Sequence, residues 1–141
     1  MTGQECRNCD SGQYRAGDDD NPESCAECPK GYDQDTKGQA SCLPCLPGEF
    51  GNETGLFQCH KCGVGKVSAI SESWNCSDCD AGRYQKSEGQ ALCLPCIPGE
   101  YANATGMQSC VQCEIGTISN VSEATECSDC EVGTSSTAKE E

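Results

Sequence analysis

The chain has 141 residues, 16 of them cysteine, and carries a formal net charge of −14. Leu, Ile, Val and Phe make up only about 11% of the residues, which excludes an ordinary hydrophobic core and calls for cross-links instead. The acidic charge argues against nucleic acid and anionic membranes as partners, and no apolar run is long enough to predict membrane insertion.

The cysteines lie in eight C-x-x-C pairs. The step between the first cysteines of successive pairs is constant at 17 from Cys25 to Cys127, and only the step from Cys6 to Cys25 is longer, at 19. A fixed period of this kind is typical of a repeat array. In chain order the pairs are Cys6/Cys9, Cys25/Cys28, Cys42/Cys45, Cys59/Cys62, Cys76/Cys79, Cys93/Cys96, Cys110/Cys113 and Cys127/Cys130.

A glycine follows the second cysteine of every pair by three residues, from Gly12 to Gly133. Glycine at a fixed offset indicates a turn with positive φ or a close approach of another backbone. A β-forming residue follows it in seven modules, with Ser135 as the exception. We therefore expect short two-stranded hairpins with first strands near Tyr14, Tyr32, Phe50, Val67, Tyr84, Tyr101 and Ile118.

The simplest disulfide pattern joins the second cysteine of each pair to the first cysteine of the next pair. Spacing alone leaves other connectivities open. The pattern leaves Cys6 and Cys130 unpaired. It predicts Cys9–Cys25, Cys28–Cys42, Cys45–Cys59, Cys62–Cys76, Cys79–Cys93, Cys96–Cys110 and Cys113–Cys127.

Modules three apart are alike in sequence. The segment C-L-P-C-L-P-G-E-F at 42–50 returns as C-L-P-C-I-P-G-E-Y at 93–101, a step of 51 positions. Three modules therefore form one larger unit of the repeat. This longer period indicates either contacts that recur at every third module or a recent duplication.

Sequons of the form N-x-S/T occur four times, at Asn52, Asn75, Asn103 and Asn120. Sequons favour a secreted, glycosylated chain with disulfides, because both belong to oxidising compartments. Zinc ribbons, with pairs of C-x-x-C as ligands, and iron–sulfur or redox C-x-x-C sites are the alternatives. The even spacing and acidic charge favour disulfides over these metal sites.

The two ends of the chain read as halves of one further module. In series, 16 residues separate Cys130 from the following Cys6, against 15 between Cys9 and Cys25. We expect residues 131–141 to join residues 1–5 of a following unit, in a longer chain or through a Cys130–Cys6 disulfide between copies. The alternatives are a fragment of a longer ectodomain and an internal Cys6–Cys130 bridge.

No catalytic set can be assembled, and no enzyme activity, metal or cofactor is predicted. His60 is expected to be merely exposed between bridged cysteines. The acidic stretch 18–21, with Glu23 nearby, could hold calcium but is expected to be a solvated turn. Trp74 is either a binding anchor or packs over a disulfide or a sugar on Asn75. The tyrosines and Phe50 are expected to cover the hairpins.

The pattern C-x-x-C-x-P-G-E-[YF], followed by a polar stretch and another C-x-x-C, resembles the ephrin-receptor-like cysteine-rich repeat over about residues 6–133. That repeat is similar to modules of tumour-necrosis-factor and growth-factor receptors, and similar arrays occur in protist surface proteins. The resemblance implies a spacer, a coat or a ligand-binding stalk, and it does not choose among them.

We therefore predict a small disulfide-rich fold: an elongated array of short β-hairpins over residues 1–141, with little or no helix and a linear disulfide ladder. The expected function is that of an extracellular, glycosylated structural protein. Its partners would be N-linked glycans and copies of itself, joined head to tail in a surface coat or filament. The alternative is the ligand-binding or spacer stalk of a cell-surface receptor.

Overall fold

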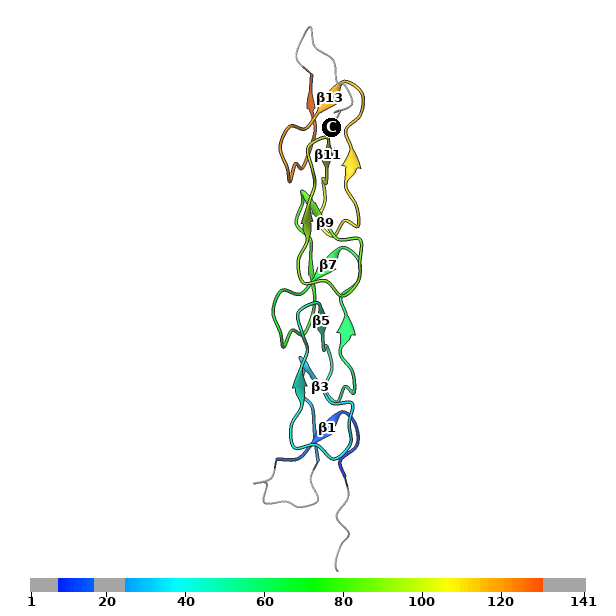
Figure 1. Ribbon diagram of the computed structural model, residues 1–141, viewed down its shortest axis with the longest axis vertical. Helices are drawn as coiled ribbons and strands as arrows, with labels where there is room; N and C mark the ends of the chain where they lie inside the picture. Colours follow the sequence, from blue (N-terminus) through cyan, green and yellow to red (C-terminus); the bar gives the residue numbers. More distant parts are fainter. Residues whose placement is uncertain (1–7, 17–24, 131–141) are drawn as a thin grey trace, which may run out of the picture. The chain divides into compact units, whose positions relative to one another are not determined.

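The computed structural model describes residues 8–16 and 25–130 (Figure 1). Its secondary structure within these ranges consists of antiparallel hairpins of very short strands, without any helix. No described segment is a helix of the length and apolarity needed to span a membrane. The hairpins are β1 (Gln13–Tyr14) with β2 (Ala26–Glu27), β3 (Tyr32–Asp33) with β4 (Leu43–Pro44), β5 (Glu49–Phe50) with β6 (His60–Lys61), β7 (Lys66–Val67) with β8 (Ser77–Asp78), β9 (Arg83–Tyr84) with β10 (Leu94–Pro95), β11 (Glu100–Tyr101) with β12 (Val111–Gln112), and β13 (Thr117–Ile118) with β14 (Ser128–Asp129).

The chain divides into two compact units. One comprises residues 1–61 and 68–76, and the other comprises residues 62–67 and 77–141. The first contains the hairpins from β1 to β6. The second contains those from β7 to β14, while the loop between β7 and β8 belongs to the first unit.

Each first strand begins at a tight turn that the glycine makes possible. In the turn of residues 46–49, the Glu49 N–H donates to the Leu46 carbonyl at 2.9 Å. Pro47 and Gly48 are its central residues, and Gly48 has a φ of 92°. A type II turn places proline well at its second position and needs positive φ at its third, which glycine adopts without strain. The P-G of the repeat thus sets the start of β5.

Each second strand consists of the two residues between the cysteines of a C-x-x-C pair. The first cysteine of the pair closes the disulfide of that hairpin, and the second begins the next. In hairpin β3–β4, the Cys45 N–H donates to the Gly31 carbonyl at 2.8 Å. The spacing within the pair therefore matches one strand and fixes the chain between two successive disulfides.

The predicted disulfide ladder and the predicted fold class are confirmed. Cys62 and Cys76 are disulfide-bonded, and Cys130 is a free cysteine among the described residues. Sulfur in a disulfide is no thiolate ligand, so the bridged cysteines do not form the zinc sites considered above. The other bridges are Cys9–Cys25, Cys28–Cys42, Cys45–Cys59, Cys79–Cys93, Cys96–Cys110 and Cys113–Cys127.

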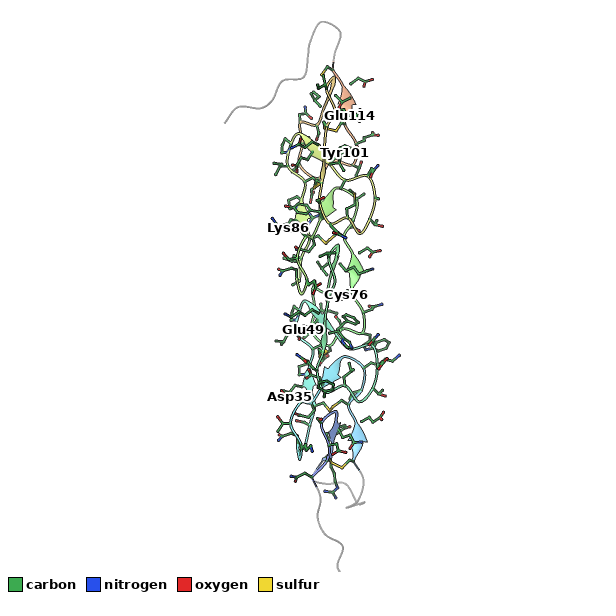
Figure 2. The ribbon with its side chains drawn as sticks, turned by 90° about the vertical axis from the view of Figure 1, so that its right-hand side faces the viewer. Asp35, Glu49, Cys76, Lys86, Tyr101 and Glu114 are labelled. Atoms are coloured by element: carbon green, nitrogen blue, oxygen red, sulfur yellow. A yellow bond between two sulfur atoms is a disulfide. The ribbon has the colours of Figure 1, made fainter. Side chains whose placement is uncertain are left out.

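Sulfur atoms replace large apolar side chains in the core. The largest fully buried side chains are those of Cys28, Cys45, Cys62, Cys79 and Cys96. Each of them is the second cysteine of its pair, whereas the first cysteines are mostly more exposed. Charged side chains such as Asp35, Lys86 and Glu114 point outward from the ribbon (Figure 2). These charged groups are therefore hydrated and do not have to be buried.

Backbone hydrogen bonds join neighbouring modules in a repeating pattern. In the second unit, the Gly82 N–H donates to the Ala102 carbonyl at 2.8 Å, and the Ala102 N–H donates to the Ala124 carbonyl at 3.0 Å. The Gly106 N–H donates to the Cys79 carbonyl at 2.7 Å. In the first unit, Gly31 and Gly51 make corresponding bonds. Stacking of this kind depends on backbone register and tolerates varied side chains.

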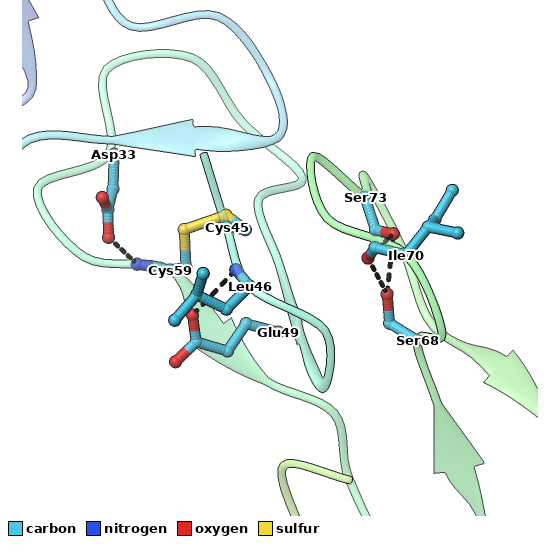
Figure 3. Close-up of a disulfide and its surroundings, with 8 residues drawn as sticks. All are labelled: Asp33, Cys45, Leu46, Glu49, Cys59, Ser68, Ile70 and Ser73. Carbon is cyan, nitrogen blue, oxygen red and sulfur yellow. Dashed lines mark hydrogen bonds between the residues drawn. A yellow bond between two sulfur atoms is a disulfide. The ribbon is translucent and has the colours of Figure 1, made fainter. Parts of the chain in front are cut away.

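Polar side chains add hydrogen bonds both between modules and within them. Figure 3 shows the Asp33 carboxylate accepting the Cys59 N–H at 2.8 Å, next to the Cys45–Cys59 disulfide. In the same view the buried Ser68 hydroxyl bonds to that of Ser73 at 2.6 Å. These side chains supply hydrogen bonds to loop groups that have no partner in a β-strand.

Gln34 and Gln85 occupy equivalent positions three modules apart; both are buried, and they make the same two hydrogen bonds. The Gln85 amide donates to the Leu92 carbonyl at 2.8 Å, and its oxygen accepts the Ser87 N–H at 3.0 Å. We expect Gln85→Leu to lower the free energy of unfolding by about 1–3 kcal/mol, because two loop groups lose their partners. Thermal unfolding under non-reducing conditions measures this loss.

The control is Gln90→Leu, since Gln90 is exposed and its amide bonds only to the neighbouring Glu88 carbonyl. This surface change is expected to stay within about 0.5 kcal/mol. Equal losses for the two variants would show that the buried amide has no special role.

Candidate assembly site

The C-terminal end of the disulfide ladder is an unbridged cysteine. Hairpin β13–β14 is complete: Cys113 is bridged to Cys127, and the Cys130 N–H donates to the Gly116 carbonyl at 2.9 Å. In this position Cys45, Cys79 and Cys96 each bridge to the following hairpin. Cys130 is half-buried and unbridged in the described part of the chain. Its thiol is therefore placed to begin another hairpin.

Asn8, the residue before Cys9, lies where a second strand lies in the other modules. Asn8 contacts the Cβ position of Gly38 at 2.9 Å, as the strand residues Glu27 and Asp78 contact those of Gly55 and Gly106 at 3.3 and 3.4 Å. Asn8 thus occupies the place of a second strand. Within residues 8–16 and 25–130, however, no first strand pairs with it.

The backbone of Cys9 makes one of the two hydrogen bonds that the corresponding cysteines make. Its carbonyl accepts the Gly38 N–H at 2.8 Å, as the Cys28 carbonyl accepts the Gly55 N–H. The Cys28 N–H also donates to the Gly12 carbonyl at 2.9 Å, but Cys9 has no such acceptor among the described residues. Cys6, which we predicted to bridge to Cys130, lies outside those residues.

All four sequon asparagines are exposed, so each side chain is accessible to modification. Asn52, Asn103 and Asn120 occupy one repeat position, four residues after the module's glycine, whereas Asn75 directly precedes the bridged Cys76. Three of the four sequons thus share one place in the module.

The other candidates do not assemble into a site. His60 lies exposed on β6, with its ring 5.4 Å from that of Phe50. No metal-binding group of three or more His, Cys, Asp or Glu side chains occurs in residues 8–16 and 25–130. The acidic stretch 18–21 and Glu23 lie outside the described residues.

Trp74 is exposed, and its ring lies 5.9 Å from the Lys30 ammonium group. This cation–π contact was not foreseen.

Two glutamates occupy a backbone conformation that glycine adopts elsewhere. Glu72 and Glu123 have φ values of 63° and 60°, at the repeat position where four other modules have glycine. Each carboxylate contacts a residue that follows a module's glycine: Glu72 accepts the Tyr32 hydroxyl, and Glu123 pairs with Arg83. The departures from glycine were visible in the sequence but not interpreted. Their carboxylates connect modules that are two apart.

The pKa of Tyr32 is raised above its ordinary value of 10.0. The largest cause is the hydrogen bond to Glu72, followed by desolvation of the phenol and by the negative charge of Glu72. A raised pKa means that the neutral phenol stabilises the fold. This stabilisation is present below pH 10 and is lost as the pH rises through the raised pKa. We expect Glu72→Gly to lower the Tyr32 pKa toward 10.0, as measured by ultraviolet titration of tyrosinate.

Glu123→Gly is the control for this titration, since it removes the equivalent carboxylate beside Arg83 and leaves Tyr32 untouched. A Tyr32 pKa that does not respond to Glu72→Gly would contradict the contact.

Hairpins that are held by one disulfide each and stacked through their backbones define a disulfide-rich repeat protein. The protein-family model described as tyrosine-protein kinase ephrin type A/B receptor-like matches residues 31–79 and again 65–102, together about half of the chain. The chain belongs to this ephrin-receptor-like family of cysteine-rich domains. No curated protein matches the chain.

The family membership agrees with the resemblance found in the sequence. It makes the chain a receptor-like repeat protein of the extracellular, disulfide-rich type. Disulfide-rich repeat domains of this family are in general not enzymes, and the word kinase in the family's description refers to the receptors that give it its name.

Proposed function

We propose that this chain is a secreted, N-glycosylated structural protein without enzymatic activity, whose units join end to end in a surface coat or filament. The observation that carries the proposal is the free Cys130, which follows the last of the described disulfides. The position of Asn8 supports it, because Asn8 takes the place of a second-strand residue at one end, and Cys130 takes the place of a cysteine that begins a further hairpin at the other. Contacts that do not close on themselves generate filaments.

The covalent step would be a disulfide between Cys130 of one unit and Cys6 of the next. Both thiols lose their protons and together two electrons, and a small-molecule disulfide takes these up and becomes two thiols. The 16 residues between the two cysteines are close to the 15 in the bridged Cys9–Cys25 module. The same module would form without this exchange in a longer chain that carries the units in tandem.

The surface fits a hydrated coat. A net charge of −14 makes neighbouring units repel laterally, and sugars on the exposed Asn52 and Asn103 would add bulk and water. Growth would then be favoured at the ends of the units, where hairpins are completed.

The alternative function is the ligand-binding or spacer stalk of a receptor, which the family match favours. Such a stalk would place its binding residues at one point along the array and would not repeat them at every third module. Exposed Trp74 with Lys30 occurs once, since the equivalent residue three modules further along is Thr125. A ligand that protects Trp74 from modification and leaves the ends unlinked would support the stalk.

Mass spectrometry of native, non-reduced material tests the proposal, first on the intact protein and then on its peptides after non-reducing digestion. We expect intact masses of linked units, a Cys130–Cys6 peptide or a peptide that runs from Glu141 into Met1, and sugar on Asn52 and Asn103. A secreted Cys130→Ser variant should stay monomeric, and Ser128→Ala, two residues away, serves as its control. A monomer with an internal Cys6–Cys130 bridge, or free thiols with bare asparagines, would contradict the proposal.

A further inference from the structure

One of the four sequons overlaps a disulfide and a strand. In Asn75-Cys76-Ser77 the middle residue is bridged, and Ser77 begins β8, where it pairs with Val67 of β7. Asn75 itself is exposed. The sequon is thus accessible at its asparagine and fixed at its other two residues.

The chain is also held on both sides of this sequon. Two residues before Asn75, the Ser73 carbonyl accepts the Gly51 N–H at 2.9 Å. Directly after the sequon, Asp78 forms an ion pair with Lys66 of β7, with 2.5 Å between Oδ1 and Nζ. The tripeptide therefore cannot leave its hairpin without breaking contacts at both ends.

The other three sequons lie in loops between the two strands of a hairpin. They are residues 52–54 between β5 and β6, residues 103–105 between β11 and β12, and residues 120–122 between β13 and β14. All three residues of each of these sequons are exposed. The repeat explains the difference, because an asparagine directly before a C-x-x-C pair places the rest of its sequon in the bridge and the second strand.

Transfer of an N-linked glycan needs the whole sequon. The Asn75 amide nitrogen would form a bond to the first carbon of a sugar that is activated on a lipid pyrophosphate. The bond from that carbon to the phosphate breaks, and the nitrogen loses one proton. The transferring enzyme also has to bind the Ser77 hydroxyl, so the backbone of the tripeptide has to enter its groove. A segment that is bridged at its centre and paired along β8 cannot do so.

We propose that Asn75 is a conditional glycosylation site, modified only while the disulfide between Cys62 and Cys76 is open. This inference rests on the proposed function, in which the chain is secreted and glycosylated. Disulfides form in the same oxidising compartment. Closing this one removes two protons and two electrons from the thiols, which a small-molecule disulfide takes up as two thiols.

The order of the two reactions then decides the product. A disulfide that closes first excludes the sugar, whereas a sugar already attached to the exposed Asn75 does not obstruct the bridge. Two forms of the chain would result, with and without a glycan next to the exposed Trp74. The three loop sequons would be modified in both forms.

The occupancy of each sequon in the full chain, made in secretory cells, tests this order. Enzymatic removal of the sugars in heavy-oxygen water converts each occupied asparagine into labelled aspartate, which mass spectrometry of the peptides counts. In the wild type we expect Asn75 to be occupied less often than Asn52 and Asn103. Dithiothreitol during synthesis keeps the thiols reduced, so it is expected to raise the occupancy of Asn75 severalfold and to leave Asn52 and Asn103 unchanged.

Cys62→Ser opens this one disulfide and keeps the sequon intact. It is expected to raise the occupancy of Asn75 severalfold without the reductant. Cys113→Ser is the matched control, because it opens the bridge to Cys127 three modules further along, where Glu126 stands in place of the asparagine. It should leave Asn75 unchanged. Occupancy is measured in whole cells, so that a variant that is not secreted is still counted.

The outcomes separate this inference from the proposed function. If Asn75 is occupied as often as Asn52 in the wild type, or if neither the reductant nor Cys62→Ser raises its occupancy, the conditional site is overturned, while sugar on Asn52 still supports the proposed function. If Asn75 responds as expected but the units remain monomers, the end-to-end array fails and the conditional site stands. Bare asparagines under all conditions would overturn both.

Discussion

Gly65→Ala is expected to lower the free energy of unfolding by about 3–5 kcal/mol, whereas Gly116→Ala should cost only about 1–2 kcal/mol. Both substitutions place a Cβ on a residue with positive φ, so they share the conformational cost. Only Gly65 also has the Gly106 carbonyl in the space that the Cβ needs. The difference between the two variants therefore measures how tightly modules two apart are packed.

Urea unfolding of the oxidised chain, at concentrations too low for association, gives the two free energies. Hydrogen exchange then locates the damage, since the Cys79 N–H donates to the Gly65 carbonyl at 2.9 Å and should lose protection in Gly65→Ala. If the two variants agree within about 0.5 kcal/mol, the backbone of Gly106 moves aside easily. The close approach would then be no constraint on the repeat.

The hairpins and the disulfide ladder could be predicted because both depend on short-range features. The P-G at 47–48 determines a turn by itself, and the two residues between paired cysteines leave room for one strand and no more. Once each hairpin is closed, joining adjacent pairs is the pattern that crosses the shortest loops. Periodicity therefore determined the module, and the simplest of the disulfide patterns that it left open is the one the structure has.

The contacts between modules could not be predicted, because they depend on how one module lies on the next. The carbonyl that Gly82 reaches is that of Ala102, in the next module, and no local signal marks it. Nothing in the sequence singles out Gln85, since a buried amide and an exposed one look alike there. Glu123 was likewise counted only as negative charge, although its positive φ and its contact with Arg83 set it apart.

Removal of an internal disulfide by Cys79→Ser with Cys93→Ser is expected to destabilise the chain by about 4–6 kcal/mol. Opening a loop of this length costs roughly 3 kcal/mol in chain entropy, and the hydroxyl that replaces the buried Cys79 sulfur adds about 1–3 kcal/mol if it lacks a partner. The terminal disulfide Cys113–Cys127 has the same sequence separation of 14. Its loss should cost only the first part, because Cys113 is half-buried.

Hydrogen exchange distinguishes the two double variants further. Modules in a linear array are stabilised mainly by their neighbours. The internal variant should therefore lose protection in the modules before and after the removed disulfide. The Gly65 N–H, which donates to the Gln85 carbonyl, reports on the module before it, and the Ala102 N–H reports on the module after it. The terminal variant should lose protection around β13 and β14 while Gly65 stays protected. Equal destabilisation by the two variants would mean that the disulfides act through chain entropy alone, and that their buried sulfur is not the core of the fold.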